Sequence, residues 1–246
     1  MTESIRPDPT NHAPTDAMID HEHPDVTGGW LRPAVFGAMD GLVSNFALVM
    51  GVTGGSDDTK PVLLAGLAGL AAGAFSMAAG EYTSVASQSE FALAQIDIER
   101  DEIERNGPAE QAELAAMYVD KGVEEDTARE VAAQIHRNVD NAVGVHAREE
   151  FGVDANELAS PRVAAVWSFF AFALGALVPL LPLLLGIEAV WPIVALSLVG
   201  LFACGALVTN VTSRSWWYGG VRQLVLGGVA GTLTYFIGDI VGTSLG

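Results

Sequence analysis

Two pairs of glutamates are the feature of this sequence best suited to bind a metal ion. Glu99 and Glu102 form the first pair, and Glu110 and Glu113 form the second, just beyond an expected helix break at 106–108. Residues three apart share a helix face, so a hairpin at the break would bring four carboxylates together. Converging carboxylates repel one another unless a cation holds them. The spacing is compatible with a divalent-metal site, and its alternative is a solvated acidic helix surface, which is the usual meaning of such runs.

His146 and Glu150 add a second kind of ligand to this cluster. They are four residues apart, on one face of an expected helix, and could close the metal site. Glutamate with occasional histidine is the ligand set of helical carboxylate proteins that bind iron. A membrane-anchored di-iron oxidase is therefore one alternative function. Such enzymes use Glu-x-x-His motifs, and this sequence contains none.

Asp40 is a carboxylate inside an apolar stretch. Ionisable residues at membrane depth are costly and usually mark a path for substrate or protons. The alternative is a neutral aspartic acid bonded to a neighbouring backbone. Met77, in the next apolar stretch, is expected at a similar depth, with Glu81 one turn nearer the cytoplasm. A thioether beside carboxylates suits a borderline metal such as ferrous iron, although a lone methionine is usually a packing residue.

Five apolar stretches are long enough to cross a bilayer, which takes about 20 helical residues. They cover residues 33–53, 61–83, 163–185, 190–210 and 221–241. The sequence thus predicts an all-α polytopic membrane protein with five transmembrane helices. The expected organisation is a disordered cytoplasmic tail (1–29), spans one and two (30–86), a cytoplasmic helical metal-binding domain (87–160) and spans three to five (161–246).

Basic residues predict the orientation of these spans. With five spans, eleven of the twelve Lys and Arg residues fall on one side, and only Lys60 falls on the other. The positive-inside rule places the N-terminus and the acidic domain in the cytoplasm and the C-terminus outside. No signal peptide is expected, since residues 1–28 lack an apolar core. We therefore expect a multi-pass protein of the cell membrane.

Composition excludes other classes of function. The formal charge of -18 argues against nucleic-acid binding, which needs basic surface. The single cysteine, Cys204, permits neither a disulfide framework nor a thiolate cluster. No enzyme activity and no prosthetic group are expected.

The acidic domain is expected to contain four helical segments. The first continues span two as far as Arg105, and the chain then breaks with Gly107 as the residue after the helix end. The next segments are 109–120, 124–137 and 139–151, and glycines at 122 and 152 end two of them.

Several motifs resemble the vacuolar iron transporter family, over nearly the whole chain from Leu31 onward. The most specific are Gly-Ala-Met-Asp-Gly-Leu-Val-Ser at 37–44 and Ala-Gly-Ala-Phe-Ser-Met-Ala-Ala-Gly-Glu-Tyr at 72–82. Gly-Ala-Leu at 205–207, Gly-Gly at 227–228 and Thr-Tyr-Phe-Ile-Gly at 234–238 are similar to the family's last two spans.

The resemblance implies a homodimer of five-span subunits that exports ferrous iron in exchange for protons. It implies that Asp40 and Met77 line the transport path. It also implies that glutamates of the cytoplasmic domain bind metal, and these match Glu99, Glu102, Glu110, Glu113 and Glu150. Protonation of Asp40 or Glu81 would lower metal affinity and couple export to proton entry.

One departure from the family concerns metal preference. Relatives often carry two adjacent methionines where this chain has His146 and Ala147. Losing soft sulfur ligands leaves an exporter of manganese or zinc as an alternative. A membrane-bound metal sensor or buffer is a further alternative, although it would need no carboxylate in the membrane. Three tail histidines, His12, His21 and His23, could also bind metal, but a disordered polar tail is the favoured interpretation.

Overall fold

The structure is a computed structural model that describes residues 29–155, 157–209 and 214–245. The tail histidines at 12, 21 and 23 lie outside these ranges. Within them the chain is helical and has no strand, which confirms the predicted all-α class. The helices are α1 (Leu31–Gly55), α2 (Thr59–Asp120), α3 (Glu125–Ile135), α4 (Val139–Glu150), α5 (Pro161–Leu177), the 3₁₀ turn η1 (Val178–Leu180), α6 (Leu181–Leu184), α7 (Val190–Val208) and α8 (Trp216–Leu245).

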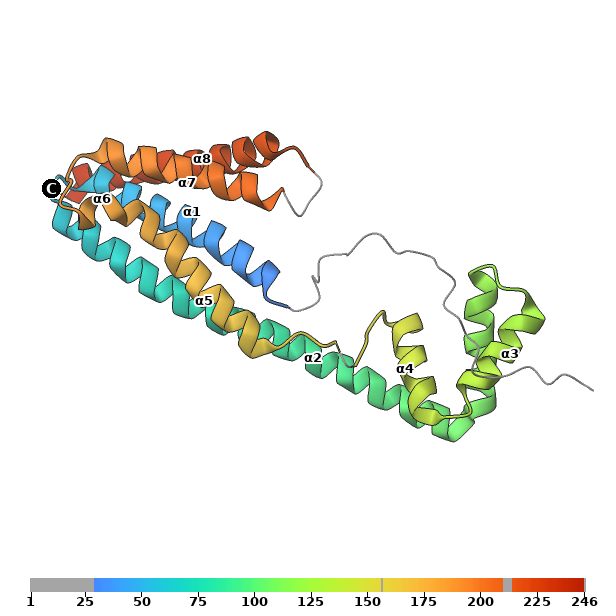
Figure 1. Ribbon diagram of the computed structural model, residues 1–246. Helices are drawn as coiled ribbons and strands as arrows, with labels where there is room; N and C mark the ends of the chain where they lie inside the picture. The colour runs from blue at the N-terminus through green and yellow to red at the C-terminus, as the bar shows by residue number, and fades with distance from the viewer. Residues whose placement is uncertain (1–28, 156, 210–213, 246) are drawn as a thin grey trace, which may run out of the picture.

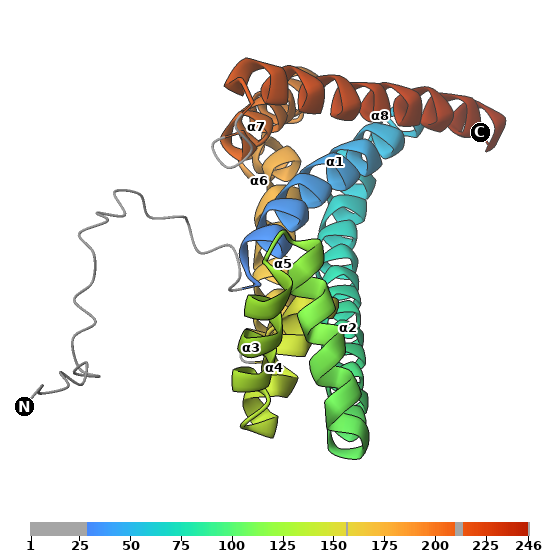
Figure 2. The same cartoon turned by 90° about the vertical axis from the view of Figure 1, so that its right-hand side faces the viewer.

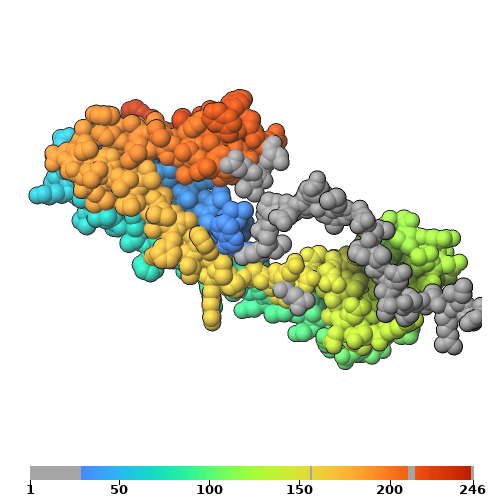
Figure 3. All heavy atoms as spheres, in the orientation of Figure 1, coloured from blue at the N-terminus to red at the C-terminus, as the bar shows by residue number. Residues whose placement is uncertain are grey.

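Among the described residues, five helical stretches are long and apolar enough to cross a membrane. They are Leu31–Gly55, the apolar part of Thr59–Asp120, Pro161–Leu184, Val190–Val208 and Trp216–Ser244. Figure 1 shows them as a bundle at one end of the molecule, with α3 and α4 at the other end and α2 joining the two. The filled view in Figure 3 has the same elongated outline. The chain is a multi-pass membrane protein, as its sequence predicts.

Helix α1 lies at the centre of the bundle and contacts α5, α8, α2 and α7. Small residues let its backbone approach its neighbours closely, as is common between membrane helices. A Cβ atom on Gly41 would lie only 2.2 Å from the carbonyl oxygen of Phe172 in α5. A Cβ atom on Gly175 of α5 would lie 2.1 Å from the carbonyl oxygen of Ala38. The α1–α5 crossing therefore depends on glycine at both positions.

The C-terminal helix α8 also packs on α1 through glycines that let the two backbones approach closely. Gly51 and Gly54 of α1 face the α8 backbone, and a Cβ atom on Gly238 would lie 1.8 Å from the carbonyl oxygen of Gly51. Figure 2 shows α8 crossing the direction of α2 at a steep angle. Much of α8 consequently stays exposed on the side of the bundle, where apolar side chains such as Phe236 and Ile237 face outward.

The third span is not one uninterrupted helix. It begins at Pro161 with the side chain of Ser160 as its N-cap, and it passes through η1 before a last turn as α6. Pro179 and Pro182 lie at the start of η1 and α6. Proline lacks the N–H that would continue the helical hydrogen bonds, so the break follows from the sequence, although the predicted span 163–185 did not include it.

Helix α2 continues from the bundle into the polar domain, as predicted, and kinks near its far end. The kink is at Asn106, which has φ of -143° and ψ of 47°. The predicted break at 106–108 is confirmed as this kink, with the helix resuming at Pro108. Gly107 does not end the first part in a left-handed conformation, because it is not among the glycines with positive φ. Pro108 has no N–H for the carbonyl of Glu104, which accounts for a kink rather than a full stop.

Two small cores hold the polar domain together. Ile96 and Ile103 of α2 pack against Ala142, Val143 and Ala147 of α4. Beyond the kink, Leu114 and Ala115 pack against Ala128 and Ala132 of α3. Gly122, with φ of 94°, follows α2, and Gly152, with φ of 65°, follows α4, as their positions predicted. The left-handed conformation at these positions favours glycine.

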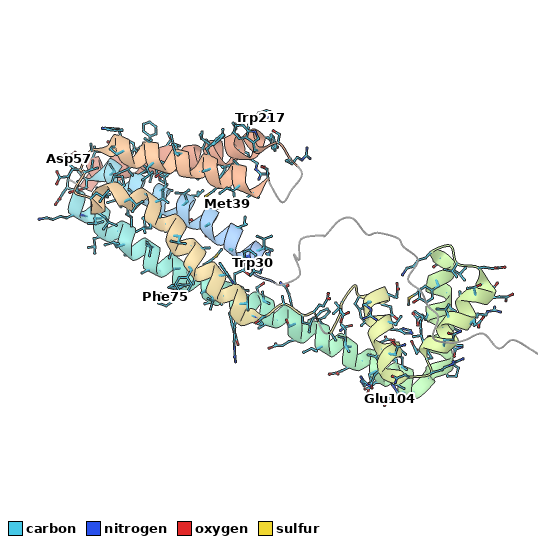
Figure 4. The ribbon with its side chains drawn as sticks, in the orientation of Figure 1. Trp30, Met39, Asp57, Phe75, Glu104 and Trp217 are labelled. Carbon is cyan, nitrogen blue, oxygen red and sulfur yellow. The ribbon has the colours of Figure 1, made fainter. Side chains whose placement is uncertain are left out.

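Successive spans run in opposite directions through the bundle, as a five-span protein requires. The start of α1, the polar domain and the start of α8 lie toward one end of the bundle, and the C-terminus lies at the other (Figure 1). Figure 4 shows Trp30 and Trp217 toward the first end and Asp57 at the second. Tryptophans favour the membrane–water interface, so their positions fit a bundle that crosses a bilayer between these levels.

We predict that Gly41→Ala lowers the thermal unfolding midpoint of the detergent-solubilised protein. The added methyl group meets backbone of α5, which cannot rotate away, and overpacking typically costs about 1–3 kcal/mol. Gly228→Ala is the matched control, because the nearest atom to its Cβ would be Leu198 Cδ2 at 3.8 Å. Equal midpoints for both variants would contradict the close α1–α5 approach.

Candidate metal-binding and transport site

Glu99 is held inside the polar domain by the core on either side of it. It lies on α2 between Ile96 and Ile103, which both face α4, so its side chain enters the same interface. Glu99 is only 2% exposed. On the opposite side, Val143 and Ala147 of α4 are buried in the same core, and they bring His146 to meet Glu99. The buried position of both side chains thus follows from helical periodicity in α2 and α4.

The structure brings three predicted ligands together. Ligand atoms of Glu99, Glu110 and His146 all lie within 4.8 Å of one another. His146 is fully buried, and its Nδ1 lies 2.9 Å from Glu99 Oε1 and 2.7 Å from Glu150 Oε1. Glu110 comes from the part of α2 beyond the kink, so the break at Asn106 is what closes the site, much as the predicted hairpin would.

Glu102 and Glu113 lie beside this group but are exposed. Their charges still act on it. Burial, followed by the charge of Glu150, raises the pKa of Glu99 to about 7, and Glu110 and Glu102 add to the rise. Burial, followed by the charges of Glu113 and Glu102, also raises the pKa of Glu110. The six predicted ligands thus form one electrostatic group, with Glu102 and Glu113 at its rim.

Two atoms in this group are buried and make no hydrogen bond among the described residues. His146 Nε2 has no partner, and Glu99 Oε1 lies 2.9 Å from His146 Nδ1, which makes its hydrogen bond to Glu150 Oε1 instead. Buried polar groups are nearly always satisfied, so each such atom calls for a reason. Both atoms carry lone pairs that can coordinate a borderline divalent cation. A cation bound here would satisfy them and relieve the repulsion that raises the pKa of Glu99.

The spans contain a second polar site. Asp40, Met77 and Glu81 line one pocket of about 380 Å³ between α1 and α2, closed on one side by Phe172 of α5. Ser44 donates a hydrogen bond to Asp40 Oδ1 at 2.9 Å. The sequence placed Asp40 and Met77 at a similar depth, and the shared pocket agrees with that expectation. A carboxylate and a thioether here can bind a borderline metal transiently.

Two groups in this pocket are buried and unsatisfied. Glu81 is 8% exposed and its Oε2 has no hydrogen-bond partner among the described residues. Asn45 is 2% exposed, and its Nδ2 donates to the carbonyl oxygen of Ala176 at 2.6 Å while its Oδ1 is unpartnered. The bond to α5 fixes the amide, and the free oxygen adds a ligand that suits hard and borderline cations.

Sequence reasoning missed two residues at these sites. Asn45 carried a usable signal, because a polar amide within an apolar span usually bonds to a neighbouring helix. His136 carried none, since it follows α3 and meets His146 only through the packing of α3 and α4, with 5.2 Å between the ring centroids. Burial, the largest influence, lowers the pKa of His136.

In the part of the chain that the structure describes, a bundle of five apolar helices holds a polar pocket, and a group of carboxylates lies outside it. This arrangement defines the class of polytopic membrane proteins, and the carboxylates suit cations. The chain belongs to the VIT family, whose sequence pattern matches residues 31–239. This is a family of transporters and not of enzymes.

Relatives over most of the chain have iron transport in their names. "Vacuolar iron transporter homolog 2" of Oryza sativa subsp. japonica is 36% identical over 213 residues, which is 85% of this chain and 88% of the rice protein. "Vacuolar iron transporter 1" of Arabidopsis thaliana is 27% identical over 91% of this chain and 92% of its own length. "Vacuolar iron transporter" of Acanthamoeba castellanii is 43% identical over 155 residues, 63% of this chain and 56% of the amoebal protein. These relatives confirm the resemblance seen in the motifs and support metal transport.

The raised pKa of Glu99 predicts how the metal-free polar domain responds to pH. A glutamate that is protonated more readily when folded stabilises the fold below its ordinary pKa of 4.5, and the benefit is lost as pH rises through about 7. Amide protection in α4, corrected for intrinsic exchange rates, should therefore fall from pH 5 to pH 8. Since one pKa unit is a factor of ten, we expect Glu99→Gln to raise protection at pH 8 by about tenfold.

The matched control is Glu104→Gln, which removes an exposed carboxylate from the same helix. It should leave protection in α4 unchanged at both pH values. Protection that rises with pH in the wild-type protein, or an equal effect of both substitutions, would show that the Glu99 carboxylate is not strained by its burial.

Proposed function

We propose that this protein exports divalent metal, foremost Fe²⁺, from the cytoplasm in exchange for protons. The observation that carries the proposal is a pair of carboxylate sites along α2. Glu99 and Glu110 belong to the site outside the spans, and Glu81 belongs to the pocket within them. The names of the relatives support iron as the cargo.

Capture begins at the cytoplasmic group. Deprotonated carboxylates of Glu99, Glu110 and Glu150 bind the cation together with His146, and the exposed Glu102 and Glu113 draw it in. An acidic surface raises the local concentration of cations and speeds their arrival. The exposed rim and the buried centre thus have different roles, the first in attraction and the second in coordination.

Transfer through the membrane uses the pocket between α1 and α2. Glu81 lies nearer the polar domain and receives the ion, which then passes to Asp40 and Met77. The thioether disfavours hard cations such as Mg²⁺ and Ca²⁺. Metal binding requires deprotonated carboxylates, so a proton arriving at Asp40 or Glu81 from the outer side releases the metal outward. This competition is the proposed basis of exchange.

We place the protein in the cell membrane, with the N-terminus and the polar domain in the cytoplasm and the C-terminus outside. Basic residues support this orientation, because Arg32, Arg162 and Arg222 flank spans at the end of the bundle nearest the polar domain, and Lys60 begins α2 at the other end. Lys and Arg favour the cytoplasmic side. The plant relatives are named for the vacuole; transport there would likewise remove metal from the cytoplasm.

A homodimer completes the pocket in this proposal. Ser76, Gly80 and Ser84 are spaced by four, line the pocket from α2 and are exposed. A Cβ atom on Gly80 would have no atom within 4 Å. Small residues at this spacing form helix–helix contacts in membranes, and a charged pocket that faces lipid is unfavourable. A second copy of α2 would cover this side and enclose the path.

Export of manganese or zinc is the second candidate, and the absence of sulfur from the capture site favours it. His146 replaces a methionine common among relatives, so the capture site has no sulfur among its six expected ligands. A metal sensor or buffer is less well supported, because it gives no reason for Asp40 and Glu81 to share a pocket within the spans.

Asp40→Ala should abolish metal flux into inside-out proteoliposomes while metal binding to the polar domain persists. The substitution removes the carboxylate that α1 contributes to the pocket. Flux of Fe²⁺, Mn²⁺ and Zn²⁺ is measured in parallel with an imposed pH gradient, and calorimetry on the solubilised protein measures binding.

Glu104→Gln is the control for loss of one carboxylate and should transport at the wild-type rate. Normal flux through Asp40→Ala would remove Asp40 from the path. If metal flux through the wild-type protein does not change with the pH gradient, the protein transports metal but does not exchange it for protons.

Cross-linking tests the dimer. In a Cys204→Ala background, Gly80→Cys should give a covalent dimer with a short bis-maleimide in membranes, since the proposal places two copies of this helix face together. Val199→Cys is the control, because Val199 of α7 is 66% exposed but lies away from the pocket. Cross-linking at Val199 alone would place the dimer interface elsewhere.

A further inference from the structure

His136 contacts His146 of the proposed capture site, although nothing in its sequence context suggested it. It caps the C-terminal end of α3, and its ring lies edge-on to that of His146, with 5.2 Å between centroids and 83° between the ring planes. The two imidazoles therefore lie side by side, and His146 in turn lies within 4.8 Å of Glu99 and Glu110, a group to which His136 does not itself belong.

The hydrogen bonds of the two rings determine which nitrogens hold protons. His136 Nδ1 lies 2.9 Å from the carbonyl oxygen of Ala132. A carbonyl only accepts, so His136 Nδ1 carries the hydrogen and Nε2 of the neutral ring holds a lone pair. His146 Nδ1 lies against carboxylate oxygens of Glu150 and Glu99, which accept when ionised. The same tautomer follows for His146.

Both Nε2 atoms are buried and have no hydrogen-bond partner among the described residues. The same arrangement is typical of histidines that bind metal, in which one ring nitrogen donates to a carbonyl or carboxylate and the other faces the ion. A structural role as a C-cap explains the bond from His136 to Ala132. It does not explain why the other nitrogen of the ring is kept from water with nothing to bind.

We propose that His136 is a metal ligand, which binds a late first-row divalent cation through Nε2 beside the group of Glu99, Glu110 and His146. This inference rests on the proposed function of that group as the capture site. It adds a second nitrogen where the expected ligand set has one. Imidazole favours zinc, cobalt and iron, whereas carboxylates alone suit manganese and magnesium, so His136 sets the metal preference of capture.

The test compares cobalt and manganese binding to the full-length protein in detergent. His136→Asn is the informative variant, because its amide can still donate to Ala132 from the δ position but has no ε nitrogen. We expect Co²⁺ affinity to fall by about tenfold or more, as for loss of other groups that support metal sites. The visible ligand-field absorption of bound Co²⁺ should shift, and Mn²⁺ affinity should stay nearly constant.

Two further variants make the outcome specific. Gln134→Ala changes an exposed side chain near the same helix end and should alter neither metal. Glu110→Gln should weaken both metals if the proposed capture site is correct. An unchanged Co²⁺ affinity and spectrum in His136→Asn, with weaker binding in Glu110→Gln, would overturn the role of His136 and leave the capture site standing.

Failure of the capture site itself gives a different result, in which neither His136→Asn nor Glu110→Gln weakens either metal. An equal loss of Co²⁺ and Mn²⁺ binding in His136→Asn, with a lower unfolding midpoint, would assign His136 a purely structural role and also overturn the inference. If His136→Asn does not fold, His136→Gln is judged by the same ratio of Co²⁺ to Mn²⁺ affinity.

Discussion

A carboxylate held away from water needs a cation or a proton, and this constraint governs both polar sites of the molecule. The basic residues of the polar domain do not meet the need at Glu99. Arg100 pairs with Asp140 at 2.8 Å, Lys121 with Glu149, and Arg148 with Asp154 at 2.9 Å. These ion pairs lie around the cluster and leave its centre to His146. In the proposed function, such a site exchanges bound metal for bound protons.

Helix α2 connects the two sites and also separates them. Glu81 and Glu99 lie on the same uninterrupted stretch, since the kink at Asn106 comes later. With a rise of 1.5 Å per residue, the two carboxylates are about 27 Å apart along the axis. No side chain spans that distance, so an ion cannot be shared between the sites. In the proposed function it must leave the first site fully before it reaches the second, and the exposed acidic rim keeps it near the protein meanwhile.

Periodicity and composition sufficed to predict the architecture, because apolar length and the distribution of basic residues are properties of short segments. The pairs at Glu99 and Glu110 were found for the same reason, since helical spacing is local. The breaks near Asn106 and Pro179 follow from prolines in the sequence, and the first of them was predicted. The pairing of His136 with His146 depends instead on how helices pack against each other. Contacts between residues far apart in the chain, such as Gly41 with Phe172, determine that packing. The spacing of residues along the sequence does not predict such contacts.

The two sites differ in the way that directional transport requires. The group of Glu99, Glu110 and His146 in the polar domain is closed by a kinked helix and two packed cores, so it offers several ligands at once. The pocket of Asp40 and Met77 offers fewer ligands and lies open along one side of α2. Transport needs a site that binds well enough to be entered and weakly enough to be left. In the proposed function, a capture site with several ligands followed by a pocket with fewer meets that condition. The sulfur of Met77 would then discriminate against hard cations in the pocket, where few other ligands are present.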